Sequence, residues 1–365
     1  MIPANLYHTV FLYSVIALTF ISLSTIPKSY DRIRREVNSF IPALLICAVY
    51  ALWLGNRPVS GYYFGDTSNY ARTYAFMQQG YIGEIDSGEW LWNNLMYACS
   101  QTMDVSAFFT LVDIGYFGFT LWASKRLTPN NVLVMLLFNL GALSFYTYGT
   151  NGIRNGLACS IVLVFLSYIQ GTTKDKIIAA VLAFIAFNIH HTTALPILMA
   201  VISIYCVKSF KNAYIFWILS ILISLVAGST ITSLFAGLGF DDRLSYLTSM
   251  DDGMFSHTGF RWDFLIYSMM PIILGYYVII KKGIQDRTYT ILLNTYTLSN
   301  AFWVMVIRAN YSNRFAYLSW FMYPIVLAYP LLKLDIWGDI QSKRLKQIML
   351  AHVGFTWFMS TFYWQ

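Results

Sequence analysis

The residues best suited to chemistry in this 365-residue chain lie in short polar motifs at the ends of long apolar runs. One motif extends from Asn151 to Ala158 and contains Arg154, Asn155 and Gly156. It opens an apolar run, so we expect Arg154 in the first turn of a helix. There the unpaired backbone N–H groups and the helix dipole both favour anions. The alternative is an arginine that only anchors its helix to lipid phosphates.

A second motif offers a proton acceptor. His190 and His191, followed by two threonines, end another apolar run. Histidine titrates near neutral pH and acts as a general base or as a donor. Consecutive helical residues project about 100° apart, so the two rings do not face one cavity. We expect His191 to be the functional one because it is nearer the aqueous end. Asp66, between Gly65 and Tyr70, is the rival base, and a structural role for both histidines is the alternative.

A third motif collects donors for an anion. Arg308, Asn313 and Arg314 fall within one short segment, which Tyr317 follows. The planar guanidinium of arginine binds phosphate through two parallel hydrogen bonds, whereas lysine acts as a point charge. The segment therefore predicts a site for a phosphate or a pyrophosphate.

Composition places these motifs in a membrane protein. Hydrophobic residues make up 57% of the chain and charged residues 11%, whereas soluble domains have about 25% charged residues. Runs of about 20 apolar residues cross a bilayer. Twelve such runs predict an all-α polytopic protein with one membrane domain over residues 1–365. They lie near 4–25, 39–55, 104–123, 131–148, 153–170, 176–190, 193–207, 213–229, 263–280, 288–307, 315–332 and 346–364.

The basic residues orient the predicted bundle. Of the 24 lysines and arginines, 17 fall in alternate loops, which the positive-inside rule makes cytoplasmic. The seven that remain on the other side are all arginines: Arg57, Arg72, Arg154, Arg243, Arg261, Arg308 and Arg314. Three of them, Arg154, Arg308 and Arg314, fall at the outer mouths of predicted helices, so we interpret the outward arginines as facing a lipid-linked phosphate. The alternative is snorkelling to the interface or pairing with outer acids. The net charge of +7 is spread over short clusters, so no nucleic-acid partner is expected.

Two outer segments, about 56–103 and 230–262, are long enough to fold over the bundle. In the first, apolar residues recur every four positions from Glu89 to Gln101, which predicts an amphipathic helix on the membrane surface. The second contains the pairs Asp241-Asp242 and Asp251-Asp252. A solvated loop explains these pairs better than a divalent cation site, so no metal is expected. Asp113, at mid-depth in the third run, requires a partner that the sequence does not identify.

Taken in order, these motifs resemble the EpsG family of bacterial exopolysaccharide and O-antigen polymerases of the Wzy type. The resemblance rests on four stretches of the chain: Arg57 with Gly65-Asp66-Thr67-x-x-Tyr70, Asn151-x-x-Arg154-Asn155-x-x-Ala158, His190-His191-Thr192-Thr193-Ala194-Leu195-Pro196, and Asn313-Arg314-x-x-Tyr317. The family more often has Arg-Gln where this chain has Arg154-Asn155.

The resemblance implies a GT-C-like glycosyltransferase in the bacterial inner membrane, active on the periplasmic side. It would transfer a growing glycan from undecaprenyl pyrophosphate to an incoming lipid-linked repeat unit, without a cofactor. Further partners would be membrane lipid, a flippase and a chain-length regulator. The expected roles are as follows: pyrophosphate binding by Arg154, Arg314, Arg308 and Arg57; proton acceptance by His191, His190 or Asp66; sugar binding by Asn155, Asn313, Tyr317 and Tyr70.

Two other functions remain open at this point. A flippase for lipid-linked oligosaccharides needs a cationic cavity that both sides reach, whereas the motifs here gather on one predicted side. A membrane acyltransferase of surface glycans would use the histidine pair as its base, but it needs a cytoplasmic entry for the acyl donor. Loss of a polymerase leaves surface glycans of single-repeat length, while loss of a flippase leaves none.

Overall fold

Every regular element is helical in the residues that the computed structural model describes, which are all but 1, 27–38, 82–86, 238–258, 309–311 and 364–365. Among these described residues, five helices are long and apolar enough to cross a membrane: Ala4–Ser24, Val105–Leu127, Phe210–Gly228, Trp262–Lys281 and Arg314–Lys333. Shorter apolar helices in the same part of the chain cover Phe40–Gly55, Ile153–Tyr168 and His191–Tyr205. The all-helical architecture is thus confirmed and is that of a polytopic membrane protein. The number of twelve spans and the GT-C-like arrangement stay predictions.

The helices group into two compact units. The first contains residues 1–194 and 328–365, and the second contains residues 195–327. The single domain over 1–365 stays a prediction. The helices of the first unit are α1 (Tyr7–Thr25), α3 (Phe40–Gly55), α4 (Gly61–Phe64), α5 (Thr67–Gln78), α6 (Trp90–Ser100), α7 (Val105–Leu127), α8 (Val132–Leu140), α9 (Phe145–Thr150), α10 (Ile153–Tyr168), α11 (Thr173–Ile189) and α18 (Gln341–Phe358). Short 3-10 turns, η2 (Ser87–Glu89) and η3 (His191–Thr193), precede α6 and follow α11.

Helix α10 forms the centre of the first unit. It packs against α7, α9 and α11, and α7 packs in turn against α3. Every residue of α10 from Gly156 to Leu166 is buried, so this short helix is apolar on all sides because protein surrounds it. Gly156 allows the closest approach: a Cβ there would lie 2.4 Å from the carbonyl oxygen of Tyr148 in α9.

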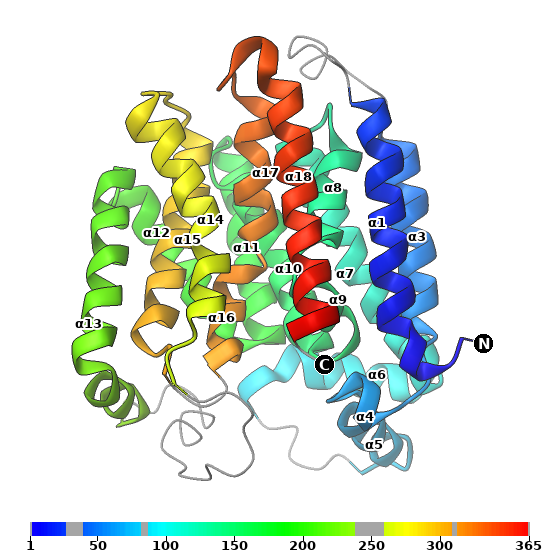
Figure 1. The fold of residues 1–365 in the computed structure, drawn as a ribbon. Helices are drawn as coiled ribbons and strands as arrows, with labels where there is room; N and C mark the ends of the chain where they lie inside the picture. The colour runs from blue at the N-terminus through cyan, green and yellow to red at the C-terminus, as the bar shows by residue number, and fades with distance from the viewer. Residues whose placement is uncertain (1, 27–38, 82–86, 238–258, 309–311, 364–365) are drawn as a thin grey trace. The chain divides into compact units, whose positions relative to one another are not determined.

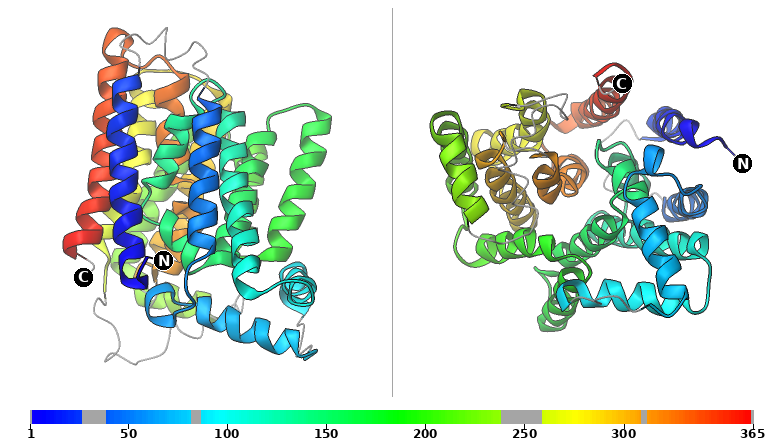
Figure 2. Two further views of the ribbon diagram at one scale, coloured as in Figure 1. Left: turned by 90° about the vertical axis from the view of Figure 1, so that its right-hand side faces the viewer. Right: turned by 90° about the horizontal axis from the view of Figure 1, so that it is seen from below.

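The predicted run 131–148 is divided into two helices, because α8 ends at Leu140 and α9 begins at Phe145. Helix α18 satisfies carbonyl groups near this break. The Thr356 hydroxyl donates to the Gly141 carbonyl (2.7 Å), and His352 Nε2 lies 2.9 Å from the Phe138 carbonyl. Helix α18 also lies beside α1, as Figure 2 shows. Residues more than 200 positions further along the chain thus bind carbonyl groups at the end of α8. Without them these acceptors would be unpaired.

The two ends of the first unit differ in character. At one end the short helices α4, α5 and α6 lie across the long helices (Figure 1). Helix α6 lies where the amphipathic helix was predicted, with Trp92, Met96 and Cys99 buried along one face; its place on a membrane surface stays a prediction. The other end contains the basic last turn of α7 and the start of α11, where Arg126 lies 3.4 Å from Asp175. Asp175 also forms a capping box with Thr172.

The helices of the second unit are α12 (Ala194–Tyr205, from its second residue), α13 (Phe210–Gly237), α14 (Trp262–Gly275), α15 (Arg287–Met305), α16 (Ser312–Trp320) and the first half of α17 (Tyr323–Lys333). Polar side chains of α15 are buried and bind neighbouring helices. Asn300 accepts from Trp217 Nε1 (2.8 Å) and donates to the Ser319 hydroxyl (3.0 Å). Asn294 donates to the Val207 carbonyl (2.7 Å). Such bonds join helices well where the surroundings are apolar.

Candidate active site

The strongest polar cluster of the first unit joins Glu89, Arg154 and His190. One carboxylate oxygen of Glu89 pairs with Arg154 Nη1, and the other is bonded to His190 Nδ1. The backbone N–H of His191 also donates to that second oxygen (3.2 Å). Three donors therefore converge on one carboxylate. We call Glu89, Arg154, His190 and the His191 N–H the anion cluster.

Three segments far apart in sequence build the anion cluster. Glu89 ends the turn η2 just before α6, and Arg154 is in the first turn of α10, as predicted. His190 ends α11 in an extended conformation (φ −153°), which frees the next backbone N–H from the helix. The side chains of Glu89 and Arg154 are 15% and 22% exposed, so the cluster is at the edge of the unit and is open to solvent.

The charges in the anion cluster keep Glu89 ionised. Burial alone raises the pKa of a carboxylate, but here the hydrogen bond and charge of His190, the charge of Arg154 and the His191 N–H outweigh it. Together they lower the pKa of Glu89 to about 2. Glu89 is the residue that the sequence analysis missed as a site residue. Charge balance was the available signal, because seven outer arginines require acidic partners.

The motif around Asp66 meets the start of α10. The Asp66 N–H donates to Asn151 Oδ1 (2.8 Å), and the Thr67 hydroxyl donates to the Thr150 carbonyl (2.6 Å). Gly65 has φ +51°, and a Cβ there would lie 2.4 Å from Asn151 Oδ1. The Asp66 carboxylate itself is on an exposed residue. The structure thus brings the Gly65-Asp66-Thr67 stretch to the motif that begins at Asn151, three residues before Arg154.

The other predicted residues of the first unit have local contacts. His191 is half-buried, and its ring stacks on Phe187 with the centroids 4.5 Å apart. Asn155 Oδ1 accepts from the Cys159 thiol (3.2 Å). Tyr70 packs its ring edge-on against Trp92 (5.6 Å). The roles predicted for these residues in proton transfer and sugar binding stay predictions.

Arg57 differs from the predicted outward-facing ligand. Its side chain is fully buried and pairs with Asp113 at 3.0 Å. Arg57 Nη1 also donates to the Leu54 carbonyl (2.7 Å), and the guanidinium lies 5.1 Å from the ring centroid of Phe109. Asp113 thereby gains the partner that the sequence did not identify. The sequence predicts an outward position for Arg57 because this residue follows the apolar run 39–55. In the structure its side chain instead points into the helix bundle, where it pairs with Asp113.

The third motif lies in the second unit. Arg308 and Arg314 are both exposed. The aliphatic part of Arg308 packs on Gly228 of α13, and its guanidinium lies 5.7 Å from the ring centroid of Phe260. Tyr317 is half-buried, with its ring 5.6 Å from that of Trp320. Asn313 is the second residue of α16, and its side chain lies outside the described residues. Arg308 and Arg314 stay predicted anion ligands.

Several expected features lie outside the described part of the chain. Arg243 and the two aspartate pairs, Asp241-Asp242 and Asp251-Asp252, belong to residues 238–258. Within the described residues, no group of three or more His, Cys, Asp or Glu side chains is placed to hold a metal ion. All four cysteines are free thiols, and Cys206 is the exposed one.

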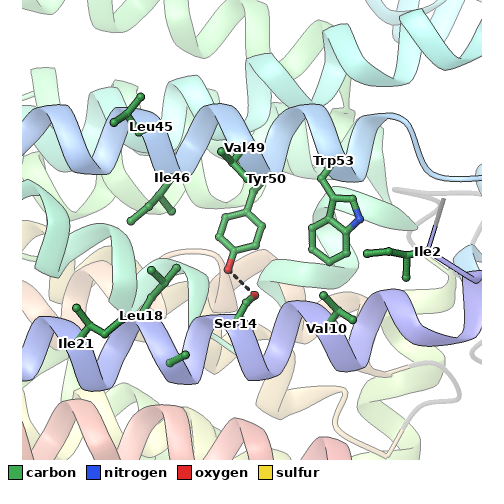
Figure 3. A pocket seen from close by; sticks show the side chains of 11 residues that line it. Ile2, Val10, Ser14, Leu18, Ile21, Leu45, Ile46, Val49, Tyr50 and Trp53 are labelled. Carbon is green, nitrogen blue, oxygen red and sulfur yellow. Dashed lines mark hydrogen bonds between the residues drawn. The ribbon is translucent and has the colours of Figure 1, made fainter.

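An apolar crevice of about 520 Å³ lies between α1 and α3 (Figure 3). Its walls include Val10, Leu18 and Ile21 on α1 and Leu45, Val49 and Trp53 on α3. A hydrogen bond between Ser14 and Tyr50 (2.7 Å) crosses it. Near one end of the crevice Trp53 stacks on Tyr7, whose ring meets Phe64 edge-on, next to Gly65. The chemistry of its walls suits a hydrocarbon chain.

The apolar helices are those of a membrane protein, and a half-exposed cluster of arginine, histidine and carboxylate groups lies at one end of its first unit. The family model of the EpsG family matches residues 44–364, and the chain therefore belongs to the EpsG family. This is a Wzy-like polymerase family, so the resemblance seen in the motifs is confirmed. No curated protein and no solved structure matches the chain. The chain is accordingly a membrane protein of the polysaccharide polymerase type.

Proposed function

We propose that the chain polymerises lipid-linked oligosaccharide repeat units at the outer face of the bacterial inner membrane. The growing glycan is transferred from undecaprenyl pyrophosphate to the terminal sugar of an incoming repeat unit. Membership of the EpsG family carries the proposal. The position of the anion cluster supports it, because the cluster lies at the end of the first unit opposite to the basic ends of α7 and α11. By the positive-inside rule, that opposite end is extracytoplasmic.

The reaction needs a group that stabilises the leaving pyrophosphate. The acceptor hydroxyl oxygen bonds to the anomeric carbon, and the bond from that carbon to the pyrophosphate oxygen breaks. Undecaprenyl pyrophosphate leaves with the electron pair, and its negative charge increases in the transition state. Arg154 is suited to stabilise this negative charge, because its side chain is half-exposed and stands at the N-terminus of α10. The apolar crevice offers a surface for the polyprenyl chain.

The proton of the acceptor hydroxyl needs a base. Asp66 is exposed and held beside Asn151 by its backbone, so its carboxylate is accessible to a substrate hydroxyl. His191 is half-exposed, whereas His190 is 3% exposed and its Nδ1 is bonded to Glu89. This geometry favours Asp66 and His191 over His190 as the proton acceptor.

A deletion strain tests the function directly. Its surface polysaccharide, separated on a gel, should show single-repeat glycans in place of a ladder, and the wild-type chain should restore the ladder. Complete absence of surface glycan would indicate a flippase instead. In the same strain, Asp66→Asn and His191→Ala identify the base: loss of a general base costs about 10²–10⁴-fold in rate. Normal ladders from both variants would exclude both as the proton acceptor.

A further inference from the structure

Glu89 fills the place where an anion would bind. Its carboxylate pairs with Arg154 Nη1, contacts His190 Nδ1 and accepts a hydrogen bond from the His191 N–H. Groups of these kinds also bind phosphate. Such donors require a partner when no substrate is bound, because half-buried polar groups without one are costly. A carboxylate from the same chain meets that need.

Two buried polar groups on residues of the anion cluster or next to it in sequence have no hydrogen-bond partner in the described part of the chain. Arg154 Nε and the Thr192 hydroxyl are buried and lack a hydrogen-bond partner within the described residues. Thr192 directly follows His191, and Nε belongs to the guanidinium that pairs with Glu89 through Nη1. Glu89 has two oxygens, whereas a pyrophosphate has more oxygens distributed around two phosphorus atoms. The larger anion is therefore the better match to the number of donors.

We propose that Glu89 is an internal competitor that occupies the pyrophosphate position of the lipid-linked donor and is displaced when that donor binds. The proposal rests on the proposed function and adds its regulation: the anion cluster is closed by Glu89 in the resting chain and opens only for a ligand that replaces the carboxylate.

Competition of this kind lowers the apparent affinity for the anion in a defined way. The apparent dissociation constant equals the intrinsic one divided by the fraction of molecules with a vacant site. If Glu89 fills the donors about nine-tenths of the time, its removal should tighten anion binding about tenfold. The low pKa of Glu89 is consistent with a carboxylate that is bound in this way at neutral pH.

The experiment measures binding of inorganic pyrophosphate to the purified full-length chain in detergent by isothermal titration calorimetry. Glu89→Ala vacates the donors, whereas Glu89→Gln removes the charge but keeps an amide in the same place. Competition predicts tighter binding for both variants, with the Ala variant tighter than the Gln variant by severalfold. Equal tightening would show only an electrostatic effect of the lost charge and would overturn the proposal. Unchanged or weaker binding would also overturn it.

A matched control comes from Asp263, whose carboxylate pairs with Arg261 and is 13% exposed, close to the 15% of Glu89. Asp263→Asn removes the same charge from a similar ion pair and should leave pyrophosphate binding unchanged. Adding Arg154→Gln to Glu89→Ala should abolish the gain. If Glu89→Ala unfolds, Glu89→Asp withdraws the carboxylate by one methylene and should give an intermediate tightening; no tightening there overturns the proposal. The wild-type ladder in the deletion strain decides the polymerase function independently of these titrations.

Discussion

Two arginines of the first unit meet a carboxylate, but in different surroundings. Arg57 and Asp113 are 0% and 1% exposed and join the segment after α3 to α7 in the interior, whereas Arg154 and Glu89 are 22% and 15% exposed at the edge. From the sequence alone, both arginines are predicted to bind pyrophosphate. Burial separates them. A pair that water does not reach has no ligand to exchange with, while a half-exposed pair can exchange its carboxylate for a substrate anion.

The energetic consequences differ accordingly. Two charges in a low-dielectric interior depend on each other, so removal of one leaves the other uncompensated. Within the described residues, three further polar atoms of this pair lack hydrogen-bond partners: Arg57 Nε, Arg57 Nη2 and Asp113 Oδ1. No other hydrogen bond to these atoms from that part of the chain would therefore compensate the loss of the ion pair. A half-exposed pair is screened by water, which replaces a lost partner at small cost. The comparison predicts a folding defect for the first pair and a functional defect for the second.

The largest effect should come from breaking the buried pair. Arg57→Met or Asp113→Leu leaves an unpaired buried charge and should destabilise the fold by about 3–5 kcal/mol. The measurement is the thermal unfolding midpoint of the purified protein in detergent, together with its yield. The double variant should recover much of the loss, because an apolar pair of similar volume avoids the desolvation cost. A single variant with the wild-type midpoint would contradict a structural role for the pair.

A smaller effect, on activity alone, is expected at Arg154. Arg154→Lys keeps the charge and loses the planar fork, which should cost about 1.5–3 kcal/mol of binding to the leaving group, roughly 10- to 100-fold in rate. Shorter or absent ladders at normal expression would show it. Arg72→Lys is the control, because Arg72 is exposed and bonds only its neighbour Asn69 at 3.3 Å among the interactions described. Full ladders from Arg154→Lys would count against bidentate binding.

The sequence predicts the helices well and their interruptions poorly. Each apolar run carries its own signal, because about 20 apolar residues cross a bilayer wherever they occur. The break after Leu140 has no such local cause. A Cβ on Gly141 would lie 2.7 Å from Val353 Cγ2, and the Gly141 carbonyl accepts from Thr356. Helix α18 therefore determines where α8 ends, and its residues are more than 200 positions away.

The candidate site was predictable in part for the same reason. Arg154 and His190 were predictable because Arg154 opens an apolar run and His190 ends one, and polar residues stand out at such ends. Glu89 was not, because its partners lie 65 and 101 positions further along the chain and no periodicity links them. The inward orientation of Arg57 was not predictable from local pattern either, because it depends on the ion pair with Asp113, which lies far along the chain. Local pattern identifies which residues reach an end of the bundle, and long-range charge pairing decides how they are used.

The next prediction tests whether the backbone at Gly65 positions Asp66 beside Asn151. Gly65→Ala places a Cβ 2.4 Å from Asn151 Oδ1 at φ +51°, so both strain and a clash oppose it. The strain alone costs about 1–3 kcal/mol, and the clash should displace Asp66 from Asn151 and shorten the ladder. Gly80→Ala is the matched control, because Gly80 has φ +79° with nothing within 4 Å of its Cβ position. Equal ladders from the two variants would show that the contact between Gly65 and Asn151 does not position the site.

The smallest effect concerns the pH dependence of stability at Glu89. Its folded-state pKa of about 2 lies below its ordinary value of 4.5, because His190 and Arg154 favour the carboxylate over the acid. The stabilisation is therefore fully present above about pH 4.5 and is lost as the pH falls from there towards 2. We expect the difference in unfolding midpoint between the wild type and Glu89→Gln to be constant from pH 7 to 5 and to shrink below 4.5. The exposed pair of Arg126 and Asp175 serves as the comparison, and Asp175→Asn should give a smaller difference at neutral pH, because water screens that pair more strongly. If the difference in unfolding midpoint between the wild type and Glu89→Gln grew on acidification, His190 and Arg154 would not stabilise the Glu89 carboxylate. The pair of Arg154 and Glu89 would then contribute no more than an ordinary surface ion pair.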